Sequence, residues 1–308
     1  MITDRPDFPI GIDSTIRAAF VACPQKAFLE YFLHWKPRME SVDLVAGKAF
    51  AAGIEATIKA YYENNEPDLD TCIAYGARAL ITEWRDYEPP EGHVKQLDRM
   101  VGALDSYFRN YGIATDYIQP YIHEGKPAVE FSFALPIPGT KHPVTGDPIL
   151  YTGRFDMLGL YNNMLFVRDE KTTKQLGPTW PKNWKMRSQI TGYCWAAREY
   201  GFPVAGALIR GVSILKNSYG HAESIQYRDD WFIERWLEQL RRDVERMVQC
   251  WEEGYWDYDL DTACTSYGGC MFQDACSAKD PTRELENNFT RRVWDPLAHE
   301  EKPYEKAG

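Results

Sequence analysis

A predicted β-hairpin is the feature that most constrains what this chain can fold into. Two strand-like runs, residues 150–160 and 164–172, flank the pair Asn162 and Asn163. Asparagine tolerates the positive φ angles that a two-residue hairpin turn requires. If these two residues form the turn, each position i pairs with position 325 − i. The pattern therefore predicts an antiparallel strand pair with a defined register.

That register brings acidic residues together. Asp156 is expected directly opposite Asp169, and Arg154 opposite Lys171. Because side chains alternate along a strand, Asp156, Asp169 and Lys171 should share one face, while Glu170 points to the other. Two carboxylates opposite each other repel unless a cation lies between them, so the arrangement predicts a hydrolytic metal site. The alternative is a salt-bridged surface hairpin in which Arg154 and Lys171 neutralise the acids.

The composition is that of a folded globular protein with an excess of negative charge. The 308 residues are 44% hydrophobic and 14% aromatic, enough for one large domain or two small ones. The net charge of −10 argues against a protein that coats nucleic acid without selectivity. No apolar run approaches the ~20 residues of a membrane span, and no charged-then-apolar leader opens the chain. We therefore expect a cytoplasmic protein with no membrane partner.

A basic segment follows the acidic pair directly. Between residues 168 and 187, six basic residues stand against two acidic ones, with two tryptophans interleaved. A solvated charged loop is the simpler alternative, but the position beside the acidic pair favours a groove that faces a polyanion. The candidate nucleic-acid contacts are Lys174, Trp180, Lys182, Trp184, Lys185 and Arg187.

The seven cysteines do not indicate a disulfide framework. Three of them, Cys264, Cys270 and Cys276, cluster at a spacing that differs from the CxxC knuckles of common zinc folds. A fourth ligand would have to come from elsewhere, and Cys23 near the N-terminus is the best candidate. The other three cysteines lie in helix-like runs and are expected to be buried small hydrophobes: Cys72, Cys194 and Cys250.

The order of elements predicts an α/β core with an added helical region and a cysteine-bound cap. Expected helices are 13–36 with a break at Cys23–Pro24, 41–64, 70–86, 94–111, 184–200 and 231–253. Expected strands are 129–135, the two hairpin strands, 204–215 and 223–227. We divide the chain into an N-terminal helical region 1–127, a core 128–254, and a cysteine cluster with a polar tail 255–308, all within one compact unit.

The motifs resemble those of the PD-(D/E)XK nuclease superfamily, specifically its RecB-like branch, which includes phage exonucleases. Gly153–Asp156 (GRFD) matches the first acidic motif, Asp169–Lys171 (DEK) the (D/E)xK motif, and Gln189–Tyr193 the QxxxY signature. The resemblance spans roughly Cys23 to Cys276. It implies a restriction-endonuclease-like fold, a mixed central sheet flanked by helices. It also implies a four-cysteine iron–sulfur site formed by Cys23, Cys264, Cys270 and Cys276.

One position departs from the family pattern. Relatives commonly carry a histidine metal ligand in a G-x-x-x-H setting, whereas Gly47 here leads to Ala51, which cannot bind a metal. Glu55, one helical turn further on, could replace it from the same face. Glu130, on the strand before the hairpin, is the other candidate. An inactive descendant of the family is the alternative that Ala51 raises.

The resemblance implies a Mg²⁺ or Mn²⁺ ion held by Asp156 and Asp169, because hard ions prefer oxygen ligands. Lys171 would orient the attacking water or stabilise the charge that develops on phosphorus. Gln189 and Tyr193 would hold the nucleic acid or the lysine, although Tyr193 could equally be a packing anchor. A [4Fe–4S] cluster is expected at the four cysteines, with Zn²⁺ as the alternative.

The function expected from these residues is a metal-dependent DNA exonuclease in phage or prophage recombination, repair or replication. A single-strand annealing protein is an expected partner, and a phage-encoded protein would work in the bacterial host cytoplasm. Two alternatives stay open. One is a non-catalytic nucleic-acid-binding protein on a decayed nuclease fold, and the other is a zinc-stabilised protein of unrelated function. The sequence does not indicate an oligomeric state.

Overall fold

The computed structural model describes residues 5–265 and 269–298 and divides the chain into two compact units. Unit 1 comprises Met1–Met39, Ser132–Gly153 and Glu234–Pro303. Unit 2 comprises Glu40–Phe131, Arg154–Ile233 and Tyr304–Gly308. This division follows spatial contacts, and the three consecutive regions expected from the sequence stay a prediction.

The central sheet is mixed, as expected for a restriction-endonuclease-like fold. Its strands follow the order β1-β7-β8-β9-β10, with β3 and β6 also paired to β7. The β7–β8 and β9–β10 pairs are antiparallel, whereas β1–β7 and β8–β9 are parallel. The strands are β1 Gly11–Asp13, β3 Gln119–Pro120, β6 Val129–Pro136, β7 Leu150–Tyr161, β8 Met164–Thr173, β9 Val204–Ile214 and β10 Tyr219–Tyr227.

Two small antiparallel pairs complete the strands of the described chain. The strand β2 Trp35–Pro37 pairs with β11 Phe289–Arg291, and β4 Ile122–His123 pairs with β5 Lys126–Pro127. The β2–β11 pair belongs to unit 1 and joins segments about 250 residues apart in the sequence.

The predicted hairpin is confirmed. Asn162 and Asn163 have φ angles of 48° and 60°, the left-handed conformation that a tight hairpin turn needs. Pairing runs from Tyr161↔Met164 to Met157↔Arg168, which is the predicted register. The turn therefore determines which residues of β7 and β8 lie opposite each other.

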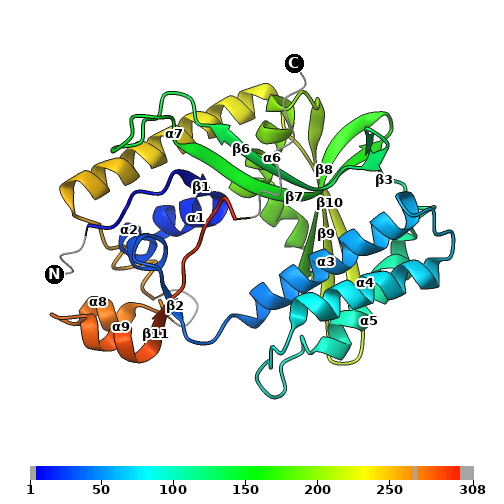
Figure 1. Cartoon of the computed structure of the whole chain (residues 1–308), viewed down its shortest axis with the longest axis horizontal. Coiled ribbons are helices and arrows are strands. Elements are labelled where there is room, and N and C mark those ends of the chain that lie inside the picture. The colour runs from blue at the N-terminus through cyan, green and yellow to red at the C-terminus, as the bar shows by residue number, and fades with distance from the viewer. Residues whose placement is uncertain (1–4, 266–268, 299–308) are drawn as a thin grey trace. The chain divides into compact units, whose positions relative to one another are not determined.

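Three helices of unit 2 form a layer with a shared apolar core: α3 Val42–Tyr62, α4 Leu69–Trp84 and α5 Leu97–Tyr111. They lie side by side in Figure 1. Two glycines let α3 and α4 approach closely, since a Cβ at Gly76 would lie 2.6 Å from the Gly53 carbonyl oxygen. These helices confirm three of the expected ones, with ends shifted by up to three residues.

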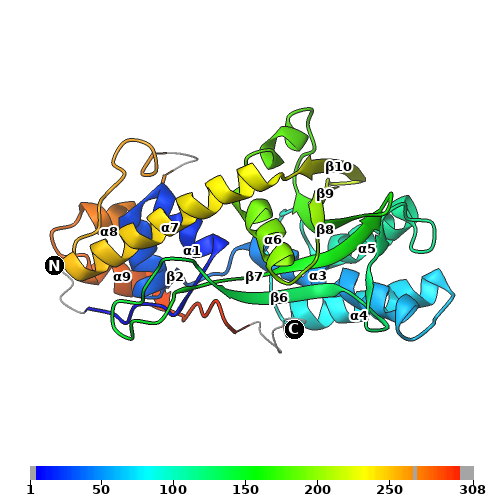
Figure 2. The ribbon, with the colours of Figure 1, turned by 90° about the horizontal axis from the view of Figure 1, so that it is seen from above.

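The remaining helix of unit 2, α6 Ser188–Glu199, packs on β8 and β9, while α5 packs on β9 and β10. Figure 2 shows β8 and β9 running between α6 and α5. The expected helix 184–200 therefore starts later, after a 3₁₀ turn, η2 Trp180–Trp184. Helices on both faces leave β8 buried on both sides, which explains its apolar residues Phe166 and Val167.

In unit 1 the predicted break at Cys23–Pro24 is confirmed. Helix α1 Ser14–Ala22 ends there, and α2 Pro24–Ala27 continues into a π-helical turn, η1 Phe28–Phe32. The long helix α7 Asp230–Glu253, which belongs to unit 1 from Glu234 onward, follows the expected span, and its stripe of Trp236, Leu240, Val244 and Met247 is buried. Two short helices, α8 Gln273–Ser277 and α9 Thr282–Asn288, precede β11. Within the described part of the chain, no helix is both long and apolar enough to cross a membrane.

Candidate active site

The end of the β7–β8 ladder gathers the predicted catalytic residues in unit 2. Regular pairing stops at Met157↔Arg168, one step before Asp156 and Asp169. The Asp156 Oδ2 atom there accepts the backbone N–H of Glu170 at 2.7 Å. Across the same face, the Lys171 Nζ atom lies 2.6 Å from Asp169 Oδ2. Asp156, Asp169 and Lys171 therefore converge as the alternation of side chains predicted.

The electrostatics of this group show an excess of negative charge. Burial, and then the neighbouring Asp169 carboxylate, raises the pKa of Asp156 well above its ordinary value. Burial also raises the pKa of Asp169, although Lys171 opposes the rise. For Lys171, burial acts to lower the pKa, but Asp169 and Asp156 outweigh it and raise the pKa. A cation bound beside these buried carboxylates would stabilise their ionised form.

Glu130, one of the two candidate third ligands, lies beside this group. It has a positive φ of 51°, and its carboxylate lies 2.6 Å from the Arg154 Nε atom. Burial, opposed by Arg154 and reinforced by Glu55, raises the pKa of Glu130 to about 7. Arg154 thus pairs with Glu130, rather than with the acids of the hairpin.

Glu55, the other candidate, lies on α3 and forms an ion pair of 2.5 Å with Lys59 one turn away. It is close enough to Glu130 to raise the pKa of that carboxyl group. Among the residues that the structure describes, no three His, Cys, Asp or Glu side chains are arranged to hold a metal ion. The choice between Glu55 and Glu130 therefore stays a prediction.

The QxxxY residues contact each other on α6. The Gln189 side-chain amide donates to the Tyr193 hydroxyl at 2.9 Å, as expected for positions four residues apart on one helix face. The Tyr193 ring packs on Phe155 with ring centroids 5.8 Å apart. Tyr193 is therefore both a packing anchor and the hydrogen-bond partner of Gln189.

The basic segment divides into exposed cations and buried rings. Lys174, Lys182, Lys185 and Arg187 are exposed. Trp180 and Trp184 retain only 6% and 8% exposure and pack edge to face with centroids 5.4 Å apart. The expectation that these two rings stack on bases is not supported, because they pack inward. Only the cations remain available to a nucleic-acid backbone, and Arg187 also opposes the burial-driven rise in the pKa of Asp169.

A buried polar network lies on the opposite face of β8, and the sequence did not predict it. The Glu170 Oε1 atom lies 2.6 Å from Arg168 Nε and accepts the Tyr107 hydroxyl at 2.8 Å. The Arg210 guanidinium on β9 donates hydrogen bonds to both carboxylate oxygens of Asp116, at 2.6 and 2.7 Å. The available signal was an arginine within each of two apolar strand runs, because a buried arginine needs an acidic partner.

The four cysteines of the predicted iron–sulfur site belong to unit 1. Burial raises the pKa of Cys276 to about 12, and Cys270, Cys23 and Cys264 each add to the rise. The backbone N–H of Cys270 donates to the Cys264 carbonyl at 3.0 Å. Because no three of the described cysteine, histidine or acidic side chains are arranged to hold a metal, the iron–sulfur site stays a prediction. The other three cysteines are buried, as expected for small hydrophobes: Cys72, Cys194 and Cys250.

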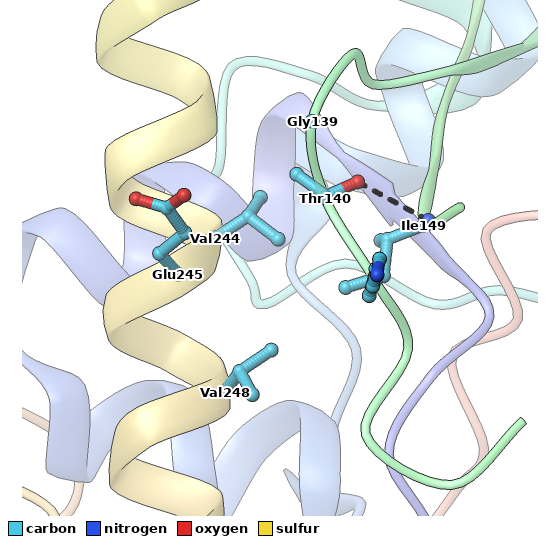
Figure 3. Close-up of a pocket in the computed structure, with 7 residues that line it drawn as sticks. Gly139, Thr140, Ile149, Val244, Glu245 and Val248 are labelled. Carbon is cyan, nitrogen blue, oxygen red and sulfur yellow. Dashed lines mark hydrogen bonds between the residues drawn. The ribbon is translucent and has the colours of Figure 1, made fainter. Parts of the chain in front are cut away.

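A separate pocket in unit 1 contains none of the predicted site residues. Its volume is about 240 Å³, and it lies between α7 and the loop that joins β6 to β7, as Figure 3 shows. The loop is held by the Thr140 hydroxyl, which accepts the Ile149 N–H at 3.2 Å. The residues that line the pocket include Gly139, Thr140, Ile149, Val244 and Glu245.

A mixed sheet whose hairpin ends in two aspartates and a lysine defines the restriction-endonuclease-like class of nuclease folds. The chain belongs to the PD-(D/E)XK nuclease superfamily, whose sequence profile matches residues 15–277. A solved structure of a candidate exonuclease from Eubacterium rectale is 12% identical, covers 81% of this chain and 84% of its own, and has a TM-score of 0.46. The structure of the protein SSO0001 is 13% identical, covers 68% and 85%, and has a TM-score of 0.28. No curated protein sequence matches this chain.

Proposed function

We propose that this protein is a Mg²⁺- or Mn²⁺-dependent deoxyribonuclease of the RecB-like branch that acts as an exonuclease. The observation that carries the proposal is the convergence of Asp156, Asp169 and Lys171 on one face of β8, while Glu170 points to the other. Membership of a nuclease superfamily supports the same reading of these residues.

The donor set fits a hard divalent ion. Asp156, Asp169 and Glu130 offer carboxylate oxygens, and burial, together with the neighbouring carboxylates, raises their pKa values. We propose Asp156 and Asp169 as ligands, with Glu130 or Glu55 as the third. A bound ion would polarise the scissile phosphate and lower the pKa of an attacking water.

Lys171 is the residue proposed to act on the reacting group directly. Its ammonium is partly exposed, and Asp169 holds it at 2.6 Å, so its direction is defined by an ion pair inside the site. From there it can orient a water molecule or stabilise the charge that develops on the phosphate oxygens. The raised pKa keeps it protonated at neutral pH, as either role as a hydrogen-bond donor requires.

The exposed cations after β8 supply the proposed path for the DNA backbone. Lys174, Lys182, Lys185 and Arg187 would contact phosphates without reading the bases, because point charges bind the backbone alone. Gln189 lies at the start of α6 near Arg187 in sequence and is proposed to hold the nucleic acid or Lys171. Binding through these residues should weaken steeply with salt.

The cysteines are proposed to hold a [4Fe–4S] cluster with a structural role. Burial, and then the other cysteines of the set, raises the pKa values of the Cys264 and Cys276 thiols, and a bound cationic centre would offset that rise by favouring the thiolates. Iron–sulfur clusters and zinc both accept four thiolates, so Zn²⁺ is the competing occupant. The visible absorbance, iron content and sulfide content of anaerobically purified protein separate the two.

The resemblance to phage exonucleases also supports a proposed biological role. We propose that the enzyme processes DNA ends in phage or prophage recombination, repair or replication, together with a single-strand annealing protein. Co-purification of the two proteins in the presence of DNA would test the partnership.

The proposed activity is tested with linear duplex and single-stranded DNA incubated with Mg²⁺ or Mn²⁺. Wild-type protein should release nucleotides, and Asp169→Asn should release none above background. Lys171→Met should lower kcat by on the order of 100-fold. Lys216→Met changes an exposed lysine of unit 2 and serves as the matched control. If the wild-type protein releases no nucleotide with either metal, the proposed deoxyribonuclease activity is refuted.

A second candidate function is favoured by one residue. Ala51 stands where relatives commonly carry a metal-binding histidine, which motivates a non-catalytic DNA-binding protein. That function predicts DNA binding that ignores divalent metal and is unchanged by Asp169→Asn. Measuring the DNA affinity of wild type and Asp169→Asn, each with and without Mn²⁺, distinguishes a nuclease from a non-catalytic DNA-binding protein.

A further inference from the structure

The buried network behind β8 is more extensive than an isolated ion pair. Arg210, with no exposed side-chain surface, bonds to Asp116 and lies 2.7 Å from Glu223 through its Nε atom. Its guanidinium stacks on Tyr111 at 3.9 Å and donates to the Tyr107 hydroxyl at 3.1 Å. Such a network has one low-energy arrangement, since each buried charge would lose its partners if another member moved.

Tyr107 joins this network to β8. Its hydroxyl accepts from Arg210 and donates to Glu170 Oε1 at 2.8 Å. Arg168, on the same face of β8, holds the same carboxylate oxygen at 2.6 Å. The Glu170 side chain is therefore held from two sides, one of them anchored on α5.

Glu170 in turn contacts the proposed catalytic residues through its backbone. Its N–H donates to Asp156 Oδ2 at 2.7 Å, just beyond the last regular pair of the β7–β8 ladder. Asp169 and Lys171 are its neighbours in the chain. A shift of the Glu170 side chain would therefore move the backbone that orients three residues of the site at once.

We propose that Tyr107 is a positioning residue that holds the Asp156–Asp169–Lys171 group in its working geometry by fixing Glu170. The proposal rests on the nuclease function proposed above and adds a residue that touches neither DNA nor metal. Its effect should appear in turnover and in metal affinity, because DNA is bound by other residues. A misplacement of catalytic groups by about 1 Å can cost 100-fold in rate.

The test compares Tyr107→Phe with Tyr117→Phe. Both variants lose one hydroxyl that donates at 2.8 Å to a carboxylate of the same network, but Tyr117 bonds to Glu223 at the exposed end. Tyr107→Phe should lower kcat by on the order of 10- to 100-fold, leave the KM for DNA unchanged, and weaken Mn²⁺ affinity measured by calorimetry. Tyr117→Phe should match wild type in all three.

Circular dichroism and thermal unfolding show whether each variant folds. If Tyr107→Phe does not fold, Arg168→Lys replaces it, because lysine keeps the charge but cannot contact both Glu170 and Asp116 as arginine does. The same kcat and Mn²⁺ losses are then expected.

Each outcome separates the two levels of the proposal. An active wild type with an equally active Tyr107→Phe, or equal losses in both tyrosine variants, overturns the positioning role alone. If wild type binds Mn²⁺ without cleaving DNA, the nuclease function fails, and unchanged Mn²⁺ affinity in Tyr107→Phe overturns the positioning role as well. A wild type that neither cleaves nor binds metal overturns both.

Discussion

Glu130 makes the stability of the metal-free protein depend on pH in a defined window. Its native-state pKa is raised from the ordinary 4.5 to about 7, chiefly by burial, and its side chain is only 10% exposed. Between these two values the native state keeps a proton that the unfolded chain has lost. The free energy of unfolding therefore falls as pH rises from about 4.5 to about 7, and levels off above the native pKa.

The shift of 2.5 pKa units corresponds to a loss of about 3 kcal/mol across this window. Because Asp156 and Asp169 also have raised pKa values, urea unfolding in EDTA at several pH values measures this loss as the difference between wild type and a variant that cannot titrate at position 130. Glu130→Gln cannot titrate, so its stability should fall by about 3 kcal/mol less than that of wild type over the same range. Glu199→Gln changes an exposed glutamate of the same unit and should follow wild type.

Divalent metal should reverse the loss at high pH, where the carboxylates are ionised. At a hundred times its Kd, an ion that binds only the native state adds about 3 kcal/mol. It should add less near pH 4.5, since protons compete for the ligands. Parallel pH profiles for wild type and Glu130→Gln would refute the assigned burial of this carboxyl group.

Four further predictions concern stability and the cysteines. Asp116→Ala leaves the buried Arg210 without its bidentate partner and should cost about 3–5 kcal/mol in urea unfolding. Gly76→Ala places a Cβ 2.0 Å from a hydroxyl and 2.6 Å from a carbonyl of α3, and should destabilise by at least about 1–3 kcal/mol. A Cβ at Gly47 meets nothing within 4 Å, so Gly47→Ala should stabilise α3 by about 1 kcal/mol. Equal melting temperatures for Gly76→Ala and Gly47→Ala would contradict the close packing of α3 and α4 at Gly76. Cys276→Ser should lose bound iron and visible absorbance, and unchanged iron content would exclude this cysteine as a ligand.

Local rules were sufficient for the centre of the site. The twin asparagines set the turn, the turn set the register, and alternation placed Asp156, Asp169 and Lys171 on one face. Each of these steps depends on residues close in sequence, so a single chain carries the information.

Long-range packing decided what the sequence did not show. Trp180 turns inward against Gly211 on β9, where a Cβ would lie 2.5 Å from the indole ring. A charged segment that contains tryptophans suggests an exposed surface for stacking on bases. The only sequence signal that the ring is buried is Gly211, about thirty residues later, which leaves room for the indole. The strands β1 and β2 were missed for a similar reason, since three residues carry no periodic signal and their partners are distant in the chain.

The Tyr107–Glu170 contact is a third case. Tyr107 fits the apolar stripe of α5, and its hydroxyl has no partner within its own helix. Only the packing of α5 reveals that the hydroxyl meets a carboxylate 63 residues further along the chain.

The interleaved division of the chain has a consequence for its synthesis. Every described residue of unit 2 precedes Glu234, whereas unit 1 needs Glu234 to Pro303 before its parts are present. On the ribosome, the Asp156–Asp169–Lys171 group can thus form before the last cysteines have been translated. No single stop codon or internal start can express unit 1 without unit 2, and its isolation calls for spliced or circularly permuted genes.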